Sequence, residues 1–155
     1  MARSEETKTV ETEQDLFQIC SFYLGEALCG IDINSVQEIS KDMEMSDVPL
    51  SPEYVLGIKN LRGGIVSVID LGEKIGLQPS KINDDSRIII VNWNDEYIGL
   101  LVDKISNILQ ADRNHLEDPP SNVKGMQGKY FQGVINTDSG LIALMNIDEV
   151  LTTEE

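Results

Sequence analysis

The sequence predicts an all-β fold with a few short helices. Short apolar segments alternate with turn-forming residues at intervals of about ten residues, a pattern typical of β-barrels and β-sandwiches. No segment offers the crossover helix of about ten or more residues that a doubly wound α/β fold requires. Apolar residues make up 41% of the 155 residues but aromatic residues only 5%, so Ile, Leu and Val must form most of the core.

The first 15 residues are expected to be a flexible acidic tail. They carry five acidic and two basic residues, and Val10 is their only large apolar side chain after Met1. Such a segment buries too little apolar surface to offset the entropy lost on ordering it. We therefore expect the folded domain to span residues 16–151, with residues 152–155 as a second tail.

The first elements after this tail are expected to be strands. Residues 16–24 and 27–31 flank Gly25-Glu26, which suits a two-residue hairpin turn with glycine first. Residues 36–39 form a further short β-like segment. Ser51-Pro52-Glu53 then has the residues of a helix start: a serine cap, a proline at the first helical position and an acidic residue near the positive end of the helix dipole.

The most informative segment spans residues 57–71, Gly-Ile-Lys-Asn-Leu-Arg-Gly-Gly-Ile-Val-Ser-Val-Ile-Asp-Leu. It predicts two short strands joined at Gly63-Gly64, with Arg62 beside the turn. The glycine that opens it limits any preceding helix to one or two turns. Residues 71–75 are expected to form another short helix, since Gly76 follows as a C-terminal cap.

The second half of the chain repeats the strand-rich pattern. The loop at 76–86 is rich in Ser, Asn and Asp, and we expect it to mark the approximate division between two stacked small barrels. An exchange of strands between the barrels is left open. Hairpin turns are expected at 94–96 and 137–140, and a closing helical turn at 147–151. The expected strands are residues 87–93, 97–102, 105–109, 130–135 and 141–146.

The charge of the chain excludes some classes of partner. The formal net charge is −15, with only 12 Lys and Arg residues. Nucleic-acid binding depends on such residues to neutralise phosphates, and docking on anionic lipid has the same requirement. We therefore expect no nucleic-acid partner, and no direct membrane insertion because no apolar run is long enough. The acidic surface is interpreted as serving solubility, with steering towards a basic partner as the alternative.

Cys20 and Cys29 are the only cysteines, and both lie in apolar strand-like segments. A free thiol in such a setting behaves as a small hydrophobic side chain. The sequence has no signal peptide that would take the chain to an oxidising compartment, so we expect two reduced structural thiols and a cytoplasmic location. A contact between the two cysteines across the hairpin is the alternative.

The sequence contains no recognisable catalytic or metal motif. His115 is the only histidine, and a zinc site needs about four ligands at Cys and His spacings that this chain lacks. Neither cysteine has the neighbouring positive charge of an activated thiolate. Asp70, Asp103 and Asp148 each end or follow an apolar strand, where we expect them to cap turns. No phosphate or calcium loop is present. We therefore expect a protein that is not an enzyme, without metal or cofactor.

Arg62 has two interpretations from the residues alone. It stands between an apolar strand end and a tight turn, where a surface arginine is common. Arginine is also the side chain best suited to planar recognition through several donors at an interface. The physical chemistry of the segment does not decide between the two.

A family resemblance shifts this balance. Asn60-Leu-Arg-Gly63, followed by a hydrophobic strand and Asp70-Leu71, resembles the signature of the CheW family, adaptors that couple chemoreceptors to the histidine kinase CheA. The resemblance extends over roughly residues 17–151, and one departure is Ser67, where the family usually carries proline. Further matching motifs are Leu24-Gly25-Glu26, Gly30-Ile-Asp-Ile33, Val36-Gln-Glu-Ile39, Val48-Pro49, Pro52-Glu-Tyr54, Ile98-Gly-Leu-Leu-Val-Asp103 and Tyr130-Phe-Gln-Gly-Val134.

The resemblance implies two five-stranded SH3-like β-barrels packed around a shared hydrophobic core. It also implies two partners, the regulatory domain of CheA and the cytoplasmic hairpin tip of methyl-accepting chemoreceptors, with the receptor in the groove between the barrels. The alternative to a partner contact differs among the candidates. The aliphatic residues could simply pack in the core, and Glu38 could simply face water. Arg62 could have a purely structural role. The candidate contact residues are Val36, Glu38, Gly57, Asn60, Arg62, Ile88 and Ile105.

The function implied is that of a non-catalytic adaptor in chemotaxis signal transduction, recruited to receptor arrays at the membrane. Within the family, the alternative is the adaptor part of a protein fused to a phosphoryl-receiver domain, or a CheA fragment. The initial Met and the absence of receiver-like βα repeats after Leu151 argue against both. A small β-barrel that binds a peptide or sugar is the alternative from another class. It predicts clustered exposed aromatic residues, yet Trp93 is the only tryptophan.

Overall fold

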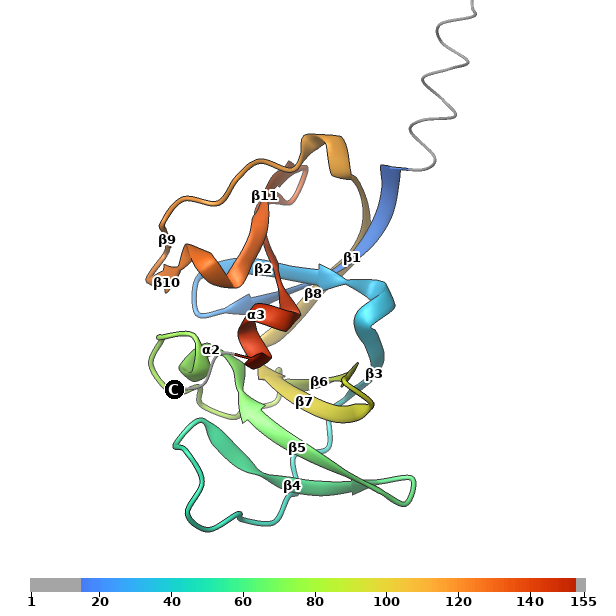
Figure 1. Ribbon diagram of the computed structural model, residues 1–155, viewed down its shortest axis with the longest axis vertical. Helices are drawn as coiled ribbons and strands as arrows, with labels where there is room; N and C mark the ends of the chain where they lie inside the picture. Colours follow the sequence, from blue (N-terminus) through green and yellow to red (C-terminus); the bar gives the residue numbers. More distant parts are fainter. Residues whose placement is uncertain (1–14, 153–155) are drawn as a thin grey trace, which may run out of the picture.

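The computed structural model of the chain describes residues 15–152, which form two β-sheets of five strands each (Figure 1). Sheet 1 has the strand order β11-β12-β2-β1-β8. Neighbouring strands in it are antiparallel except β12 and β2, which are parallel. Its strands are β1 (Leu16–Leu24), β2 (Ala27–Asp32), β8 (Lys104–Asp112), β11 (Phe131–Thr137) and β12 (Gly140–Met145).

Sheet 2 has the strand order β3-β6-β7-β5-β4. Its neighbours are again antiparallel, apart from the parallel pair of β5 and β7. Figure 1 shows this sheet below sheet 1. Its strands are β3 (Val36–Ser40), β4 (Val55–Leu61), β5 (Gly64–Asp70), β6 (Arg87–Trp93) and β7 (Glu96–Val102).

The remaining elements are short. Figure 1 shows α3 lying between the two sheets, where its Val150 is buried in the core. These elements are α2 (Leu71–Lys74), α3 (Ile147–Thr152), the small hairpin of β9 (Asn122–Val123) and β10 (Met126–Gln127), and the single turns η1 (Ile33–Ser35), η2 (Arg113–His115) and η3 (Gly128–Tyr130).

The predicted all-β class with short helices is confirmed, and each of the two units has the predicted five strands. The prediction of barrels needs a correction, because among the described residues neither sheet closes on itself through a backbone ladder. The outer strands are β8 and β11 in sheet 1 and β3 and β4 in sheet 2. Irregular segments cover the outer edges of β4 and β11 and make one isolated bridge each, Ser46 with Ile58 and Glu117 with Val134.

The helix predicted to start at Ser51-Pro52-Glu53 does not form. The backbone N–H of Val55 donates to the carbonyl of Pro52, which closes a turn, and β4 begins at Val55. The capping signals are therefore used in a turn, because the strand follows before a helical turn can be completed. The helix predicted at 71–75 is present as α2, and Asp70 caps it by accepting from the N–H of Glu73.

The chain passes from sheet 1 to sheet 2 through η1 and returns at Asp103, before β8. The loop at 76–86, where the sequence suggests a division, connects α2 to β6, and the strands on both sides of it belong to sheet 2. The two predicted tails, 1–15 and 152–155, lie almost entirely outside the described residues.

The core has a central cluster shared by both sheets, as predicted, and a smaller cluster in each sheet. The central cluster includes Phe22 and Cys29 from sheet 1 together with Ile89 and Leu100 from sheet 2, all fully buried. The smaller clusters form on the opposite face of each sheet because strand side chains alternate between faces. The two sheets are thereby fixed against each other through aliphatic packing.

No helix between residues 15 and 152 is long and apolar enough to cross a membrane.

Candidate functional site

The turn between β4 and β5 carries the arginine of the signature segment. Leu61 pairs with Gly64, so the two turn residues are Arg62 and Gly63, one position earlier than predicted. Both have positive φ, 52° and 84°, as the type I′ hairpin turn requires. The side chain of Asn60 stabilises the turn, since its Oδ1 accepts from the N–H of Gly63 at 3.1 Å. Arg62 therefore projects from a short and well-defined hairpin end.

Arg62 forms an ion pair with Glu38 on β3. Its Nη1 lies 3.0 Å from Glu38 Oε1, although the arginine side chain is 76% exposed and that of Glu38 only 24%. Glu38 Oε1 is itself buried, and among the described residues it accepts no hydrogen bond. A pair with one exposed partner contributes about 1 kcal/mol or less to stability. The guanidinium is thus held in place while most of its surface stays open to a partner.

The pair spans the open side of sheet 2. The strand order places β3 at one edge of this sheet and β4 at the other. Glu38 lies on the first of these edge strands, and Arg62 directly follows the second. The contact therefore joins two edges that no backbone ladder connects in the described chain.

Gly57, on β4, lies where a neighbouring segment approaches most closely. A Cβ atom at this position would lie 2.5 Å from the carbonyl oxygen of Ser46. Ser46 and Ile58 also exchange two backbone hydrogen bonds of 2.8 Å. Glycine is required here because no side chain fits between β4 and the segment that follows β3.

The three aliphatic candidates occupy different places. Val36 on β3 and Ile105 on β8 are half-buried and pack against the central cluster from different sheets. Ile88 on β6 is fully buried in the small cluster of sheet 2. In this structure Ile88 has no surface to offer a partner.

The structure thus brings together Glu38, Asn60 and Arg62 at one end of sheet 2. Gly57 lies further along the same strand, and the aliphatic candidates lie elsewhere.

Two exposed apolar side chains on the edge strands that carry these candidates were not identified from the sequence. Ile108 is 55% exposed and lies on β8 with Ile105, and Ile39, on β3 after Glu38, is also exposed. Both lie on edge strands, where an apolar side chain can remain uncovered. Their strands were predicted, but which strands form the edges is a long-range property that the local pattern does not contain.

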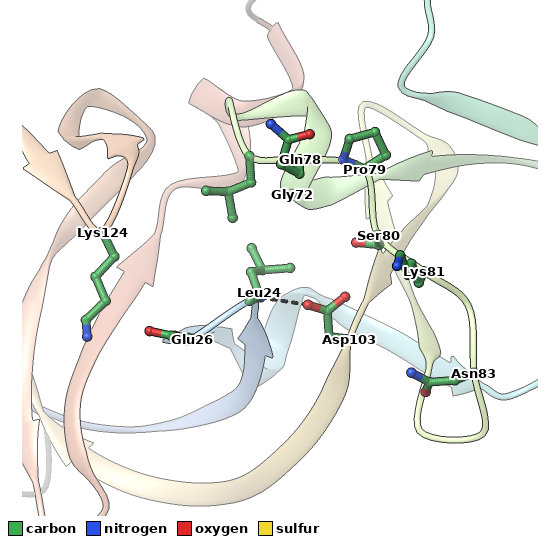
Figure 2. Close-up of a pocket in the computed structure, with 12 residues that line it drawn as sticks. Leu24, Glu26, Gly72, Gln78, Pro79, Ser80, Lys81, Asn83, Asp103 and Lys124 are labelled. Carbon is green, nitrogen blue, oxygen red and sulfur yellow. Dashed lines mark hydrogen bonds between the residues drawn. The ribbon is translucent and has the colours of Figure 1, made fainter.

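A separate pocket of about 600 Å³ lies between the β1–β2 turn and the loop that follows α2 (Figure 2). Leu24 and Leu77 give it apolar walls, and Lys81 and Lys124 lie on its rim. The carboxylate of Asp103 lines it but is engaged, because it accepts from the N–H of Gly25 at 2.6 Å. None of the seven candidate residues lines this pocket.

The carboxylates predicted to cap turns have structural partners. Asp70 accepts from the N–H of Glu73 and from the N–H and hydroxyl of Ser80. Asp148 accepts from the indole N–H of Trp93 at 2.8 Å. Within residues 15–152, no group of three or more His, Cys, Asp or Glu side chains could hold a metal ion.

Both cysteines are free and buried in the central cluster. Burial raises the pKa of the Cys29 thiol to about 12, and it raises the pKa of Cys20 as well. A higher pKa lowers the fraction of nucleophilic thiolate at neutral pH. This environment is that of a packed structural thiol, opposite to the one that activates a catalytic cysteine.

Comparison with known proteins gives the family of the chain. The model of the CheW-like domain matches residues 18–155. The chain belongs to the CheW-like domain family. A solved structure of this family, the scaffolding protein TtCheW from Thermoanaerobacter tengcongensis, has 37% sequence identity and a TM-score of 0.77, and the match covers 84% of each chain.

Curated relatives with this domain extend the comparison. The chemotaxis protein CheW of Treponema pallidum is 29% identical over 143 residues, which cover 90% of this chain and 84% of the relative. CheW of Thermotoga maritima is 29% identical over 144 residues and 93% of each chain. The chemotaxis protein CheV3 of Helicobacter pylori is 30% identical over 118 residues, which cover 74% of this chain and 38% of that longer protein. The CheW resemblance predicted from the sequence is confirmed.

Proposed function

We propose that this protein is a non-catalytic adaptor that couples transmembrane chemoreceptors to the histidine kinase CheA in chemotaxis. The observation that carries the proposal is the match to the CheW-like domain over residues 18–155, together with full-length relatives named chemotaxis protein CheW. The structure supports a binding role, because Asp70, Asp103 and Asp148 accept structural hydrogen bonds and both thiols are buried. The adaptor acts on the cytoplasmic side, where it is recruited to receptor arrays.

The proposed domain spans residues 16–151, with residues 1–15 and 152–155 as tails. We assign the recognition of partners to the surface around the seven candidate residues. Arg62 supplies an exposed guanidinium held by Glu38, and Asn60 stabilises the turn beneath it. Such a positioned arginine suits hydrogen bonding to carboxylates or backbone carbonyls of a partner.

The apolar part of the surface is assigned to edge strands β3 and β8. Val36 and Ile105 continue the central cluster to the surface, and the exposed Ile39 and Ile108 extend it. The amphipathic helix of a receptor tip would place its apolar face against these aliphatic side chains. Ile88 and Gly57 shape the surface from within sheet 2.

Kinase control then follows from bridging. One adaptor that holds a receptor tip and the regulatory domain of CheA converts the second binding event into an intramolecular one. The effective concentration of the kinase at the receptor rises without any catalytic step in the adaptor. Two modest affinities are sufficient for this effect.

The proposal is tested by titration calorimetry of the chain against the isolated CheA regulatory domain, and separately against a receptor hairpin-tip fragment. We expect saturable binding to both partners. Arg62→Ala should weaken binding to one of them by roughly tenfold or more, because it removes an interface arginine. Lys81→Ala, on the rim of the pocket in Figure 2, is the matched control and should bind as the native chain does.

Unfolding of the variants by urea separates binding from stability. Arg62→Ala should remain folded and lose no more than about 1 kcal/mol, the scale of an exposed ion pair. A folded native sample that binds neither partner contradicts the adaptor function. A loss of binding that only follows a large loss of stability contradicts the role assigned to Arg62.

A further inference from the structure

Lys59 on β4 is a lysine on the inward face of sheet 2. It pairs with Val66, which is fully buried in the small cluster of this sheet, and paired residues on adjacent strands point to the same face. Only 6% of the lysine side chain is exposed. Burying an ammonium group without a partner costs several kcal/mol, so its contacts determine whether this position is tolerated.

The partner of Lys59 is Asp42, in the segment that follows β3. Lys59 Nζ donates a hydrogen bond to the backbone carbonyl of Asp42 and lies 3.9 Å from Asp42 Oδ2. The side chain of Asp42 is 64% exposed, so the buried ammonium is paired with a carboxylate at the protein surface. The N–H of Asp42 in turn donates to the hydroxyl of Ser40, the last residue of β3.

This contact is one of three polar contacts that join the segment 38–46 to β4 and its turn. Ser46 bridges to Ile58, Asp42 contacts Lys59, and Glu38 contacts Arg62. From Ile58 to Arg62 the residue numbers rise, while those of their partners fall from Ser46 to Glu38. The segment therefore runs antiparallel to β4. Two of these contacts, Asp42 with Lys59 and Glu38 with Arg62, involve side chains, and they link the two edges of sheet 2 where no backbone ladder does.

Lys59 stands between the backbone bridge and the ion pair. Residues 39–45 separate Glu38 from Ser46, and apart from the contact of Lys59 with Asp42 the segment packs through the apolar side chains of Met43 and Met45. Arg62 is largely exposed and cannot by itself fix this separation, because exposed ion pairs are weak. The largely buried ammonium of Lys59 is the more rigid connection.

We infer that Lys59 is a positioning residue: its ammonium fixes the segment after β3 along the edge of β4 and so sets the separation at which Glu38 meets Arg62. The consequence for partner binding rests on the adaptor function proposed above. The pairing of Glu38 with Arg62 is a property of the chain alone, and it can be measured without any partner.

The test is a double-mutant cycle on the ion pair, measured by urea unfolding. The cycle compares the native chain with Glu38→Gln, Arg62→Gln and the double variant. The coupling of the pair is the factor by which the effect of one substitution on the unfolding equilibrium constant changes when the other substitution is present. We expect a ratio of about two to five in the native background, as for a pair with one exposed partner. In the Lys59→Met background, which keeps the apolar stem without the ammonium, the ratio should fall to about one.

Three further backgrounds make the result specific. Lys59→Arg keeps a charged donor and should restore the coupling. Lys41→Met removes an exposed lysine of the same segment and should leave the coupling unchanged. Asp42→Lys places a like charge beside the ammonium at an exposed position, so it folds even if Lys59→Met does not, and it should lower the coupling. An unchanged ratio in Lys59→Met or Asp42→Lys, or an equal fall in Lys41→Met, overturns the inference.

A titration with the receptor hairpin-tip fragment and the CheA regulatory domain then links the residue to function. Lys59→Met should weaken the same binding event as Arg62→Ala, and by a similar factor. If Lys59→Met lowers the coupling while Arg62→Ala leaves both titrations unchanged, the role proposed for Arg62 fails and the inference about Lys59 stands. The two failures are therefore distinguishable.

Discussion

Gly57 sets the distance between β4 and the segment that follows β3. A Cβ atom there would lie 2.5 Å from the carbonyl oxygen of Ser46, and backbone atoms cannot move aside as a flexible side chain does. The close approach also allows the two hydrogen bonds between Ser46 and Ile58. A glycine that looks like an ordinary strand interruption in the sequence is thus a packing requirement.

Gly57→Ala should lower the free energy of unfolding by about 1–3 kcal/mol, the usual cost of an added methyl group where there is no space. Urea unfolding measures this loss. The matched control is Gly64→Ala, since a Cβ at Gly64 would lie at an ordinary 3.6 Å from the carbonyl oxygen of Leu61. Equal losses in both variants would show that the approach at Ser46 is not the cause.

Cys29 provides a prediction on pH. Burial raises the pKa of its thiol from 9.0 to about 12, so at pH 8 the folded chain contains far less Cys29 thiolate than the unfolded chain. Alkylation by iodoacetamide should therefore be slow in the native state and fast in urea. Native alkylation at the rate of the unfolded chain contradicts this environment.

The same shift affects stability. The folded state holds the Cys29 proton more tightly than the unfolded state does. The contribution of the protonated thiol to the free energy of unfolding is therefore complete below pH 9.0 and is lost as the pH rises towards 12.

The site residues show what the sequence could and could not predict. A tight hairpin near Arg62 was predicted from the glycines, but the turn lies one residue earlier, since Arg62 takes the positive φ that the glycines suggested for Gly63-Gly64. The family resemblance named both Glu38 and Arg62. Their ion pair was not predicted, because it depends on which strands form the edges of sheet 2.

At the scale of elements, α3 connects the two sheets. It follows β12 of sheet 1, and Asp148 on it accepts from the indole N–H of Trp93, at the end of β6 in sheet 2. Val150 on the same helix is buried in the central cluster. A helix of only six residues gains its stability from such contacts and not from its own propensity.

Asp148→Leu should lower the free energy of unfolding by about 1 kcal/mol, the net value of one hydrogen bond. It should also change the fluorescence of Trp93, which is the only tryptophan and therefore reports on this contact directly. Asp148→Asn keeps an oxygen acceptor and is the control. If the two variants change stability and fluorescence equally, the hydrogen bond does not hold the helix.

The hairpins could be predicted because their turns are local. Gly25 has a positive φ, as do Asn94 and Asp95 in the turn between β6 and β7, and such turns are recognised from their residues. The parallel pairings of β12 with β2 and of β5 with β7 have no local signal. The return of β8 to sheet 1 was likewise not predicted, since it joins strands that are distant in sequence.

At the scale of the molecule, two open sheets share one central cluster and expose edge strands with aliphatic and charged side chains. The central cluster fixes the sheets against each other and with them the half-buried side chains of Val36 and Ile105 that pack against it. A rigid surface lowers the entropic cost of binding a partner. This property suits an adaptor whose role is to hold two other proteins together.

The most direct test of the adaptor function is a three-component binding measurement. A receptor hairpin-tip fragment is immobilised, and the CheA regulatory domain is passed over it with and without a saturating amount of this chain. The adaptor function predicts that the CheA domain is retained at least about tenfold more strongly when the chain is present. If retention is unchanged, or if the chain displaces the CheA domain, the protein does not bridge the two and the central claim is contradicted.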